Sequence, residues 1–185
     1  KISIKKEMHF PHSLGLLYSA FTNYLGFKVN SGEYKVMGLA PYGKPIYYEK
    51  IIEHIVDIKE DGSFFLDQSY FDYATGLKMI SKKFENLFKR KFRGHGENLD
   101  QFHMDIAASV QKVTEEIVIK ICKNIYLDHK TENLCLAGGV ALNCVANGKI
   151  LNNTNFKDIW IQPAAGDAGG SLGAALAYWY IVLKN

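Results

Sequence analysis

Two strand–turn–helix units in tandem, between Asn133 and Ala177, are the feature that most constrains this chain. Each unit begins with a short apolar run, reaches glycines where the run ends, and continues into a segment that favours helix. Two such units in succession predict parallel strands joined by a crossover helix. Because ligands of open α/β sheets bind outside the carboxyl ends of the strands, we expect a ligand site at the two glycine turns.

The two turns differ in the chemistry that they carry. Gly138, Gly139 and Gly166 remove side-chain bulk, so a ligand can approach the backbone, and the N–H groups at the following helix starts favour an anion. Asn143 can donate to and accept from a sugar hydroxyl or a base, or can form a helix-start hydrogen bond. Asp167 can bind a metal ion or cap the next helix. We interpret the two turns as half of a nucleotide-and-metal site.

A second glycine-rich stretch runs from Asn30 to Gly43. Its Asn-Ser-Gly start predicts a turn, a short helix follows to about Gly38, and Pro41 ends that helix. The stretch is either a loop shaped for close ligand contact or a structural connection. Lys35 could meet a phosphate or carbamoyl oxygen as a point charge, and Glu33 could orient this lysine or accept from a ribose hydroxyl.

The remaining elements are predicted from hydrophobic periodicity. Apolar residues three to four positions apart predict helices over 14–25, 47–58, 77–88 and from Asn98 or Asp100 to about Tyr126. The last of these is expected to pack centrally against the sheet. Residues 63–66 are a predicted strand, and segments 2–5 and 64–66 are expected to extend the parallel pair. The small residues of a helix over 168–182 favour close packing on that sheet.

Composition argues against several classes of protein. The 22 basic and 19 acidic residues are too evenly balanced for a nucleic-acid footprint. The three cysteines are an odd number without a close pair, which argues against a disulfide framework and fits a cytoplasmic setting. No apolar run approaches about 18 residues, so we predict no membrane-spanning helix. The basic cluster from Lys82 to Lys91 is interpreted as a solvated helix face.

The histidines do not form a recognisable catalytic or metal-binding set. His9 and His12 flank a proline and need not share a face, so metal binding by this pair is not favoured. His95 is interpreted as a solvated loop residue and His103 as a structural residue, and the catalytic residues stay unassigned. The chain begins at Lys1 without a methionine, and we expect it to be a piece of a longer protein.

Four blocks of this sequence resemble the O-carbamoyltransferases of the nodulation and antibiotic-tailoring type. They extend from end to end of the chain, and their order makes the resemblance specific. The blocks are FPHSLGLLYSAF over 10–21, GEYKVMGLAPYG over 32–43, AGGVALN over 137–143 and QPAAGDAGGSLG over 162–173.

The resemblance implies an α/β fold of the actin-like ATPase, or ribonuclease H-like, superfamily that includes sugar kinases and chaperone ATPases. Several helices would pack on a small mixed sheet. Residues 1–185 would form a single fragment, the second subdomain of the carbamoyltransferase catalytic domain. An N-terminal subdomain and a YrdC-like domain would lie in the rest of the longer chain and would be its partners.

The resemblance also implies an activity. Enzymes of this family use carbamoyl phosphate and ATP to form carbamoyl adenylate, then pass the carbamoyl group to a hydroxyl of a sugar or natural product. A divalent metal ion, Fe²⁺ by expectation or else Mg²⁺, lies between the nucleotide phosphates and protein ligands. The acceptor is therefore expected to be a hydroxyl-bearing small molecule, and neither a nucleic acid nor a membrane is an expected partner.

Family roles carry over at the matching positions. Asp167 matches the metal-ligand aspartate of the Gly-Asp-Ala-Gly turn, Asn143 the nucleoside-contacting asparagine, and Gly138 and Gly139 the nucleotide-lining glycines. The family's His-x-x-x-His pair of metal ligands has no counterpart in this sequence. The chain would thus supply one metal ligand, and alone it would have no transferase activity. Tyr18 stands where tRNA-modifying relatives have a glycine.

Two alternatives stay open. The chain could be a relative of the tRNA threonylcarbamoyladenosine synthases, or a non-catalytic interaction module with a glycine-rich core. In the second case, Asn143→Ala and Asp167→Ala would change stability and leave nucleotide binding unaffected. A sugar-kinase-like or chaperone-like ATPase is less consistent with the four blocks. An exposed sheet edge can drive dimerisation, so a homodimer is among the expected assemblies.

Overall fold

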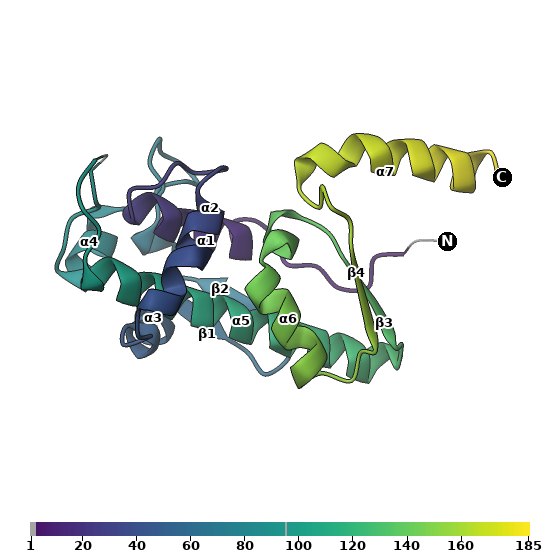
Figure 1. The fold of residues 1–185 in the computed structure, drawn as a ribbon, viewed down its shortest axis with the longest axis horizontal. Helices are drawn as coiled ribbons and strands as arrows, with labels where there is room; N and C mark the ends of the chain where they lie inside the picture. Colours follow the sequence, from purple (N-terminus) through teal and green to yellow (C-terminus); the bar gives the residue numbers. More distant parts are fainter. Residues whose placement is uncertain (1–2, 95) are drawn as a thin grey trace.

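The computed structural model describes residues 3–94 and 96–185, which form an α/β structure organised around one long helix, α5 (Gln101–His129) (Figure 1). Helix α5 begins with a capping box, in which Asp100 accepts from the His103 N–H and the His103 ring accepts from the Asp100 N–H. It ends at Lys130, whose backbone is left-handed. The predicted central helix and its Asp100 cap are therefore confirmed.

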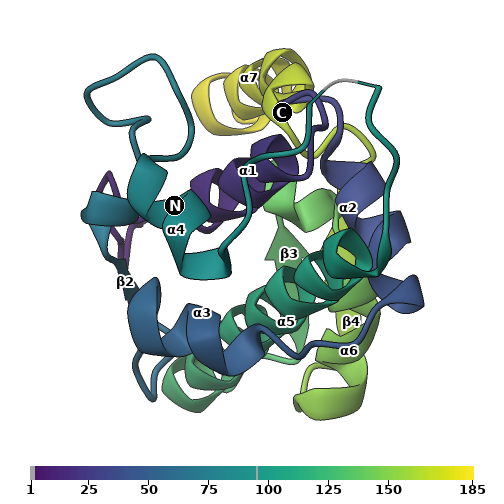
Figure 2. The ribbon, with the colours of Figure 1, turned by 90° about the vertical axis from the view of Figure 1, so that its left-hand side faces the viewer.

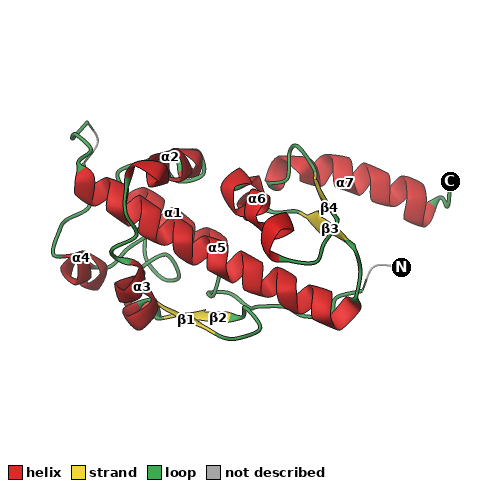
Figure 3. Ribbon diagram, turned by 60° about the horizontal axis from the view of Figure 1, so that its bottom comes forward, coloured by secondary structure: helices red, strands yellow, loops and turns green. Residues whose placement is uncertain are grey.

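Four shorter helices pack around the first half of α5 (Figure 2, Figure 3). They are α1 (Leu14–Tyr24), α2 (Glu33–Leu39), α3 (Tyr48–His54) and α4 (Lys82–Phe88). Together with α5 they bury a continuous apolar core, which we call the N-terminal cluster. At its centre, aromatic rings of α1 and α4 meet edge to face or tilted: Phe21, Tyr24, Phe84 and Phe88.

A short antiparallel hairpin also contributes to this cluster. Strand β1 (Val56–Ile58) pairs with β2 (Phe64–Leu66), with Val56 opposite Leu66. The predicted strand over 63–66 is confirmed, but the predicted helix over 47–58 is wrong over its last four residues. The helix ends at His54 and Ile55 is its C-cap, because the β-branched Val56 and Ile58 form strand β1.

The second half of α5 supports the predicted parallel pair. Strand β3 (Asn133–Leu136) lies in register with β4 (Asp158–Ile161), and α6 (Cys144–Asn153) makes the crossover. A small apolar core, which we call the C-terminal cluster, fills the space between them and α5: Cys122, Leu134, Ile150 and Phe156. The tandem units predicted from the glycine turns are therefore confirmed.

The predicted extension of this sheet is wrong within the described residues. Strand β2 pairs with β1, so it does not join β3 and β4, and residues 3–8 form no strand. The predicted helix over 77–88 begins only at Lys82, because Ser81 caps it and Leu77 is fully exposed. Within the described part of the chain, no helix is both long and apolar enough to span a bilayer.

Helix α7 (Gly170–Ala177) and the π-helical turn that continues it over 178–182 stand away from the other elements (Figure 1, Figure 3). Every residue from Gly170 to Asn185 is exposed. The predicted close packing of this small-residue helix on the sheet is therefore wrong for the structure described. Its apolar and aromatic side chains face solvent, although nothing in its sequence distinguishes it from a buried helix.

Candidate functional site

A cleft of about 870 Å³ opens where the two glycine turns meet α1 and α2. This volume lies within the usual range for a small-molecule site. The wall formed by the first half of the chain comes from Ser13 to Ser19 and Asn30 to Met37, and Thr114 of α5 also contributes. The opposite wall is made by the turns themselves: Ala137, Gly138, Gly139, Val140, Leu142, Asn143, Gly166 and Asp167.

The glycine turns lie side by side, as predicted. The Gly138 N–H donates to the Ala165 carbonyl at 2.7 Å, which joins the turn after β3 to the turn after β4. Gly138 has φ of +98°, a conformation that a side chain would strain. A Cβ atom added at Gly138, Gly139 or Gly166 would meet no protein atom within 4 Å, so bare backbone faces open space at all three positions.

The Asn143 side chain is buried, with 8% exposure, between the 3₁₀ turn Gly139–Leu142 and α6. Its Oδ1 accepts from the Ala146 N–H at 3.0 Å, so Asn143 is the N-cap of α6. Its Nδ2 donates to Gln111 Oε1 at 2.9 Å, and its Oδ1 also accepts from Gln111 Nε2 at 3.1 Å. The helix-start role considered from the sequence is confirmed, while its contact with a nucleoside stays a prediction.

A buried chain of polar groups continues from this amide. Gln111 Oε1 also accepts from the Tyr18 hydroxyl at 2.9 Å, and Gln111 Nε2 donates to Glu115 Oε1 at 3.0 Å. The other oxygen of Glu115 accepts from Lys149. Burial, with the nearby Glu115 and Glu33 carboxylates, raises the pKa of Tyr18 well above its usual range. The tyrosine is therefore a neutral hydrogen-bond donor at physiological pH.

Asp167 lies at the cleft and is exposed, in a 3₁₀ turn that leads into α7. The N-caps of that turn and of α7 are Gly166 and Gly169, so the alternative role of Asp167 as a helix cap is not observed. Among the described residues, no group of three or more His, Cys, Asp or Glu side chains could hold a metal ion. Metal binding by Asp167 stays a prediction.

Glu33 lines the cleft, but its carboxylate is already engaged. It accepts from the Ser19 hydroxyl at 2.8 Å and from the backbone N–H groups of Asn30 and Gly32 at 2.9 and 3.1 Å. Lys35 is not among the residues that line the cleft, and its Nζ lies 5.9 Å from the ring centres of Phe27 and Tyr34. The ligand roles predicted for Glu33 and Lys35 both stay predictions.

Other residues of the glycine-rich stretch and the histidines have structural contacts. A Cβ at Gly43 would lie 2.0 Å from the Met104 carbonyl oxygen, so this glycine lets the loop pack directly on α5. His12 Nδ1 accepts from the Leu66 N–H at 3.1 Å. His103 is buried in the capping box, which confirms its structural role. His95 lies outside the described residues, so its role stays a prediction.

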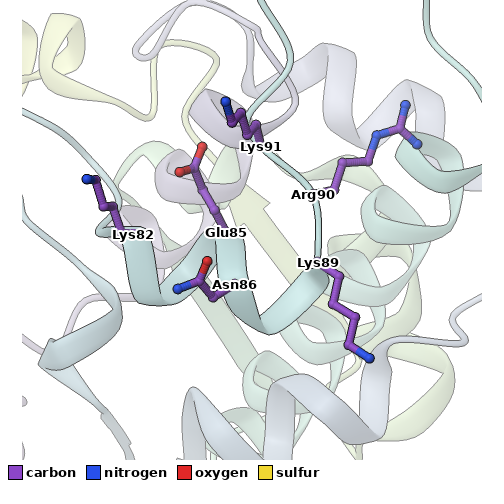
Figure 4. Close-up of a pocket in the computed structure, with 6 residues that line it drawn as sticks. All are labelled: Lys82, Glu85, Asn86, Lys89, Arg90 and Lys91. Carbon is purple, nitrogen blue, oxygen red and sulfur yellow. The ribbon is translucent and has the colours of Figure 1, made fainter.

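A second hollow, of about 560 Å³, lies on α4 and is lined by Lys82, Glu85, Asn86, Lys89, Arg90 and Lys91 (Figure 4). The cationic side chains point in different directions and do not converge on one centre (Figure 4). Arg90 is paired with Asp100, and the lysines are exposed. The prediction that this cluster is solvated is confirmed, but Lys89, Arg90 and Lys91 follow the end of α4, so only its first part is a helix face.

Sequence reasoning missed Gln111 and Glu115, which lie four residues apart on α5 and contact the Asn143 cap directly or through one another. One signal could have identified them. Both follow the helical spacing of the apolar residues in the middle of α5, where polar side chains would be buried and would need partners.

Comparison with known proteins gives a consistent set of relatives. The chain is 61% identical over 179 residues to the uncharacterized protein sll1178 of Synechocystis sp. The aligned region covers 97% of this chain and 29% of that protein. It is 40% identical over 177 residues to nodulation protein NolNO of Sinorhizobium fredii, and the aligned region covers 94% of this chain and 24% of NolNO. Nodulation protein NolO of Bradyrhizobium diazoefficiens is 39% identical to the chain over 175 residues, and the aligned region covers 94% of this chain and 30% of NolO.

The chain spans less than a third of the length of these three relatives. The family model described as Carbamoyltransferase N-terminus matches residues 1–176, which include both glycine turns and the whole cleft. The chain therefore belongs to the carbamoyltransferase N-terminus family.

Proposed function

We propose that this chain provides the nucleotide-binding part of a carbamoyltransferase. The observation that carries the proposal is the bare backbone of Gly138, Gly139 and Gly166 on one wall of a single cleft. Anionic phosphates can approach such backbone closely, and the first N–H groups of the Gly139–Leu142 turn have no partner within that turn. Family membership over residues 1–176 supports the same assignment.

The proposed fold assignment follows from the same features. We assign residues 1–185 to the second subdomain of an actin-like ATPase domain, in which the turns after β3 and β4 face the nucleotide. The remaining domains, including a YrdC-like domain, would lie in a longer protein, as in the relatives, of which this chain covers less than a third. Asp167 would be one ligand of a divalent metal ion, Fe²⁺ or Mg²⁺, whose other ligands lie outside the described residues.

The proposed reaction begins with carbamoyl phosphate and ATP. Water releases phosphate from carbamoyl phosphate, and an oxygen of the resulting carbamate bonds to the α-phosphorus of ATP as pyrophosphate leaves. The oxygen of an acceptor hydroxyl then attacks the carbamoyl carbon, AMP leaves, and the hydroxyl proton passes to solvent. This chain would hold the nucleotide and align its α-phosphate, which is a contribution of positioning. The acceptor would be a hydroxyl of a sugar or natural product.

Calorimetric titration of the full-length protein with ATP-Mg and with ADP tests the proposal. The informative variant is Gly139→Leu, because Gly139 lines the cleft and a Cβ atom there would meet no protein atom within 4 Å. Gly148→Leu is the matched control, since Gly148 on α6 is also exposed with open space at its Cβ but does not line the cleft. We expect Gly139→Leu to weaken nucleotide binding by roughly tenfold or more and Gly148→Leu to leave it unchanged.

A positive binding result leads to an activity measurement, the release of pyrophosphate that requires both ATP and carbamoyl phosphate. Equal nucleotide affinity in wild type and Gly139→Leu would refute the assignment of the cleft. That result would favour the interaction module, which one observation already supports. Both polar atoms of the Asn143 side chain are engaged within the protein, as expected if this residue serves stability alone.

A further inference from the structure

Three helices of the fold, α1, α5 and α6, meet at one buried carboxamide, that of Gln111 on α5. The side chain receives a hydrogen bond from Tyr18 of α1, exchanges two with Asn143 at the start of α6, and donates one to Glu115. Glu115 is in turn bound by Lys149 of α6. Gln111 is itself buried and does not line the cleft, so it reaches a ligand only through its partners.

Glu115 orients the Gln111 amide, and the Ala146 N–H orients the Asn143 amide in the same sense. An ionised carboxylate only accepts, so the Gln111 atom that faces it must be the Nε2 amino group. The Oε1 atom of Gln111 therefore faces Tyr18 and the Asn143 Nδ2 group. Asn143 is then oriented with its Oδ1 toward the Ala146 N–H, which is the orientation that a helix cap requires.

The reverse orientation of Gln111 would be costly at its contacts with Glu115 and Asn143. It would place its carbonyl oxygen against the Glu115 carboxylate and against Asn143 Oδ1, which leaves buried polar groups without partners. Reversing Asn143 as well would set its amino group against the Ala146 N–H, so that two donors would face each other. One orientation of both amides is thus selected. The Asn143 end of the Gly138–Asn143 turn is therefore held by Gln111 of α5.

We propose that Gln111 is a positioning residue of the cleft, which holds Asn143 and with it the Gly138–Asn143 turn, in an orientation set by Glu115. The turn ends in the anchored side chain, while its other end is bound to Ala165 through the Gly138 N–H. Both ends of the Gly138–Asn143 turn are therefore fixed by hydrogen bonds. The link from this anchor to ligand affinity rests on the proposed nucleotide function, but the anchor itself does not.

The first experiment measures the anchor without any ligand. Hydrogen exchange of the full-length protein, followed by mass spectrometry, is compared for peptides covering 138–147 in wild type, Gln111→Leu and Glu115→Gln. Ser109→Ala is the matched control, because Ser109 is a buried residue of the same helix whose hydroxyl accepts from Tyr47 N–H and donates to Asp105 carbonyl, outside the cleft.

We expect these peptides to exchange roughly tenfold faster in Gln111→Leu than in Ser109→Ala, because local opening of the turn loses several buried hydrogen bonds. Glu115→Gln preserves shape and should fall between the two, so it carries the test if Gln111→Leu does not fold. Equal exchange at the turn in Glu115→Gln and Ser109→Ala would overturn the proposal.

The second experiment measures the coupling between Gln111 and Asn143 in nucleotide affinity. If Gln111 acts through Asn143, the losses of Gln111→Leu and Asn143→Ala will not add in the double variant. Additive losses would contradict the proposed route. A wild-type protein that binds no nucleotide would instead refute the proposed function, and the exchange experiment would still decide whether Gln111 positions the turn.

Discussion

The N-terminal and C-terminal clusters build the two walls of the cleft in opposite ways. The N-terminal cluster joins five helices and a hairpin around large aromatic side chains. The C-terminal cluster is a small core of four fully or nearly buried residues beneath two parallel strands. The first wall is therefore a packed scaffold, whereas the second presents glycine backbone that buried polar contacts with α5 hold in place.

The difference between the two clusters extends to the exposure of the elements around them. Parallel strands are ordinarily covered on both faces, yet Cys135 and Trp160, which lie opposite each other on β3 and β4, are exposed. Helix α7 is exposed along its whole length. The N-terminal cluster is thus expected to determine the stability of the chain, and the C-terminal region to contribute surface.

The largest predicted effect separates these two contributions. Phe21→Ala removes a fully buried ring that packs against Phe84 and Phe88, and it should lower the free energy of unfolding by about 3–5 kcal/mol. Leu176→Ala in α7, where the side chain is 46% exposed, should change it by less than about 0.5 kcal/mol. Urea denaturation of both variants provides the measurement.

A cost of Leu176→Ala close to that of Phe21→Ala would contradict the comparison, because it would mean that α7 is packed in the folded protein. Leu17→Ala on α1 is a suitable second core variant, since it is also fully buried. Coincident unfolding transitions of the two core variants, followed by different spectroscopic probes, would show that the N-terminal cluster unfolds as one unit.

A smaller effect concerns the start of α5. Burial, reinforced by the charges of Arg90 and Arg93 and opposed by Asp100, lowers the pKa of His103 below its ordinary value of 6.5. The unfolded chain therefore binds the proton more readily, so stability should be constant above pH 6.5 and should fall as the pH drops below it. The loss should not exceed the value of the cap, about 1 kcal/mol.

Thermal unfolding from pH 8 to pH 5 measures this effect. The control is His103→Gln, because glutamine at this third helical position can also complete the capping box and does not titrate. An equal pH dependence in wild type and His103→Gln would show that other groups are responsible, among them Asp100, whose pKa is lowered mainly by Arg90 against the opposing effect of burial.

The smallest predicted effect involves no change in stability. Cys122 lies within the C-terminal cluster, and burial raises the pKa of its thiol to about 11, whereas Cys135 and Cys144 are exposed. Two thiols should react with a maleimide quickly and Cys122 only when the cluster opens. If Cys122 reacts as fast as the exposed pair, the C-terminal cluster opens independently of the rest.

The sequence predicted the elements whose patterns have one interpretation. The long helix α5, its Asp100 cap and the tandem turns were all correct, because periodicity and glycine position specify them locally. The helix over 47–58 was wrong over residues 55–58, where the apolar residues fit either a helix or a strand. The sheet extension was wrong because strand pairing depends on contacts between distant segments.

The candidate site divides in the same way. The side-by-side placement of Gly138 and Gly166 on one cleft follows from the topology of parallel strands, and it was predicted. The role of Gln111 was not, because the helical spacing that indicates burial at this position does not identify the partners of the side chain. Its meaning appears only when Tyr18 and Asn143 are brought beside it.

The exposure of the parallel sheet and of α7 has an optical consequence. The two tryptophans of the chain, Trp160 and Trp179, lie on these surfaces and are 59% and 51% exposed. The N-terminal cluster contains only phenylalanine and tyrosine rings among its aromatic side chains. Tryptophan fluorescence of this chain therefore reports the C-terminal surface alone, and a shift of its emission to shorter wavelength would register whatever comes to cover that surface.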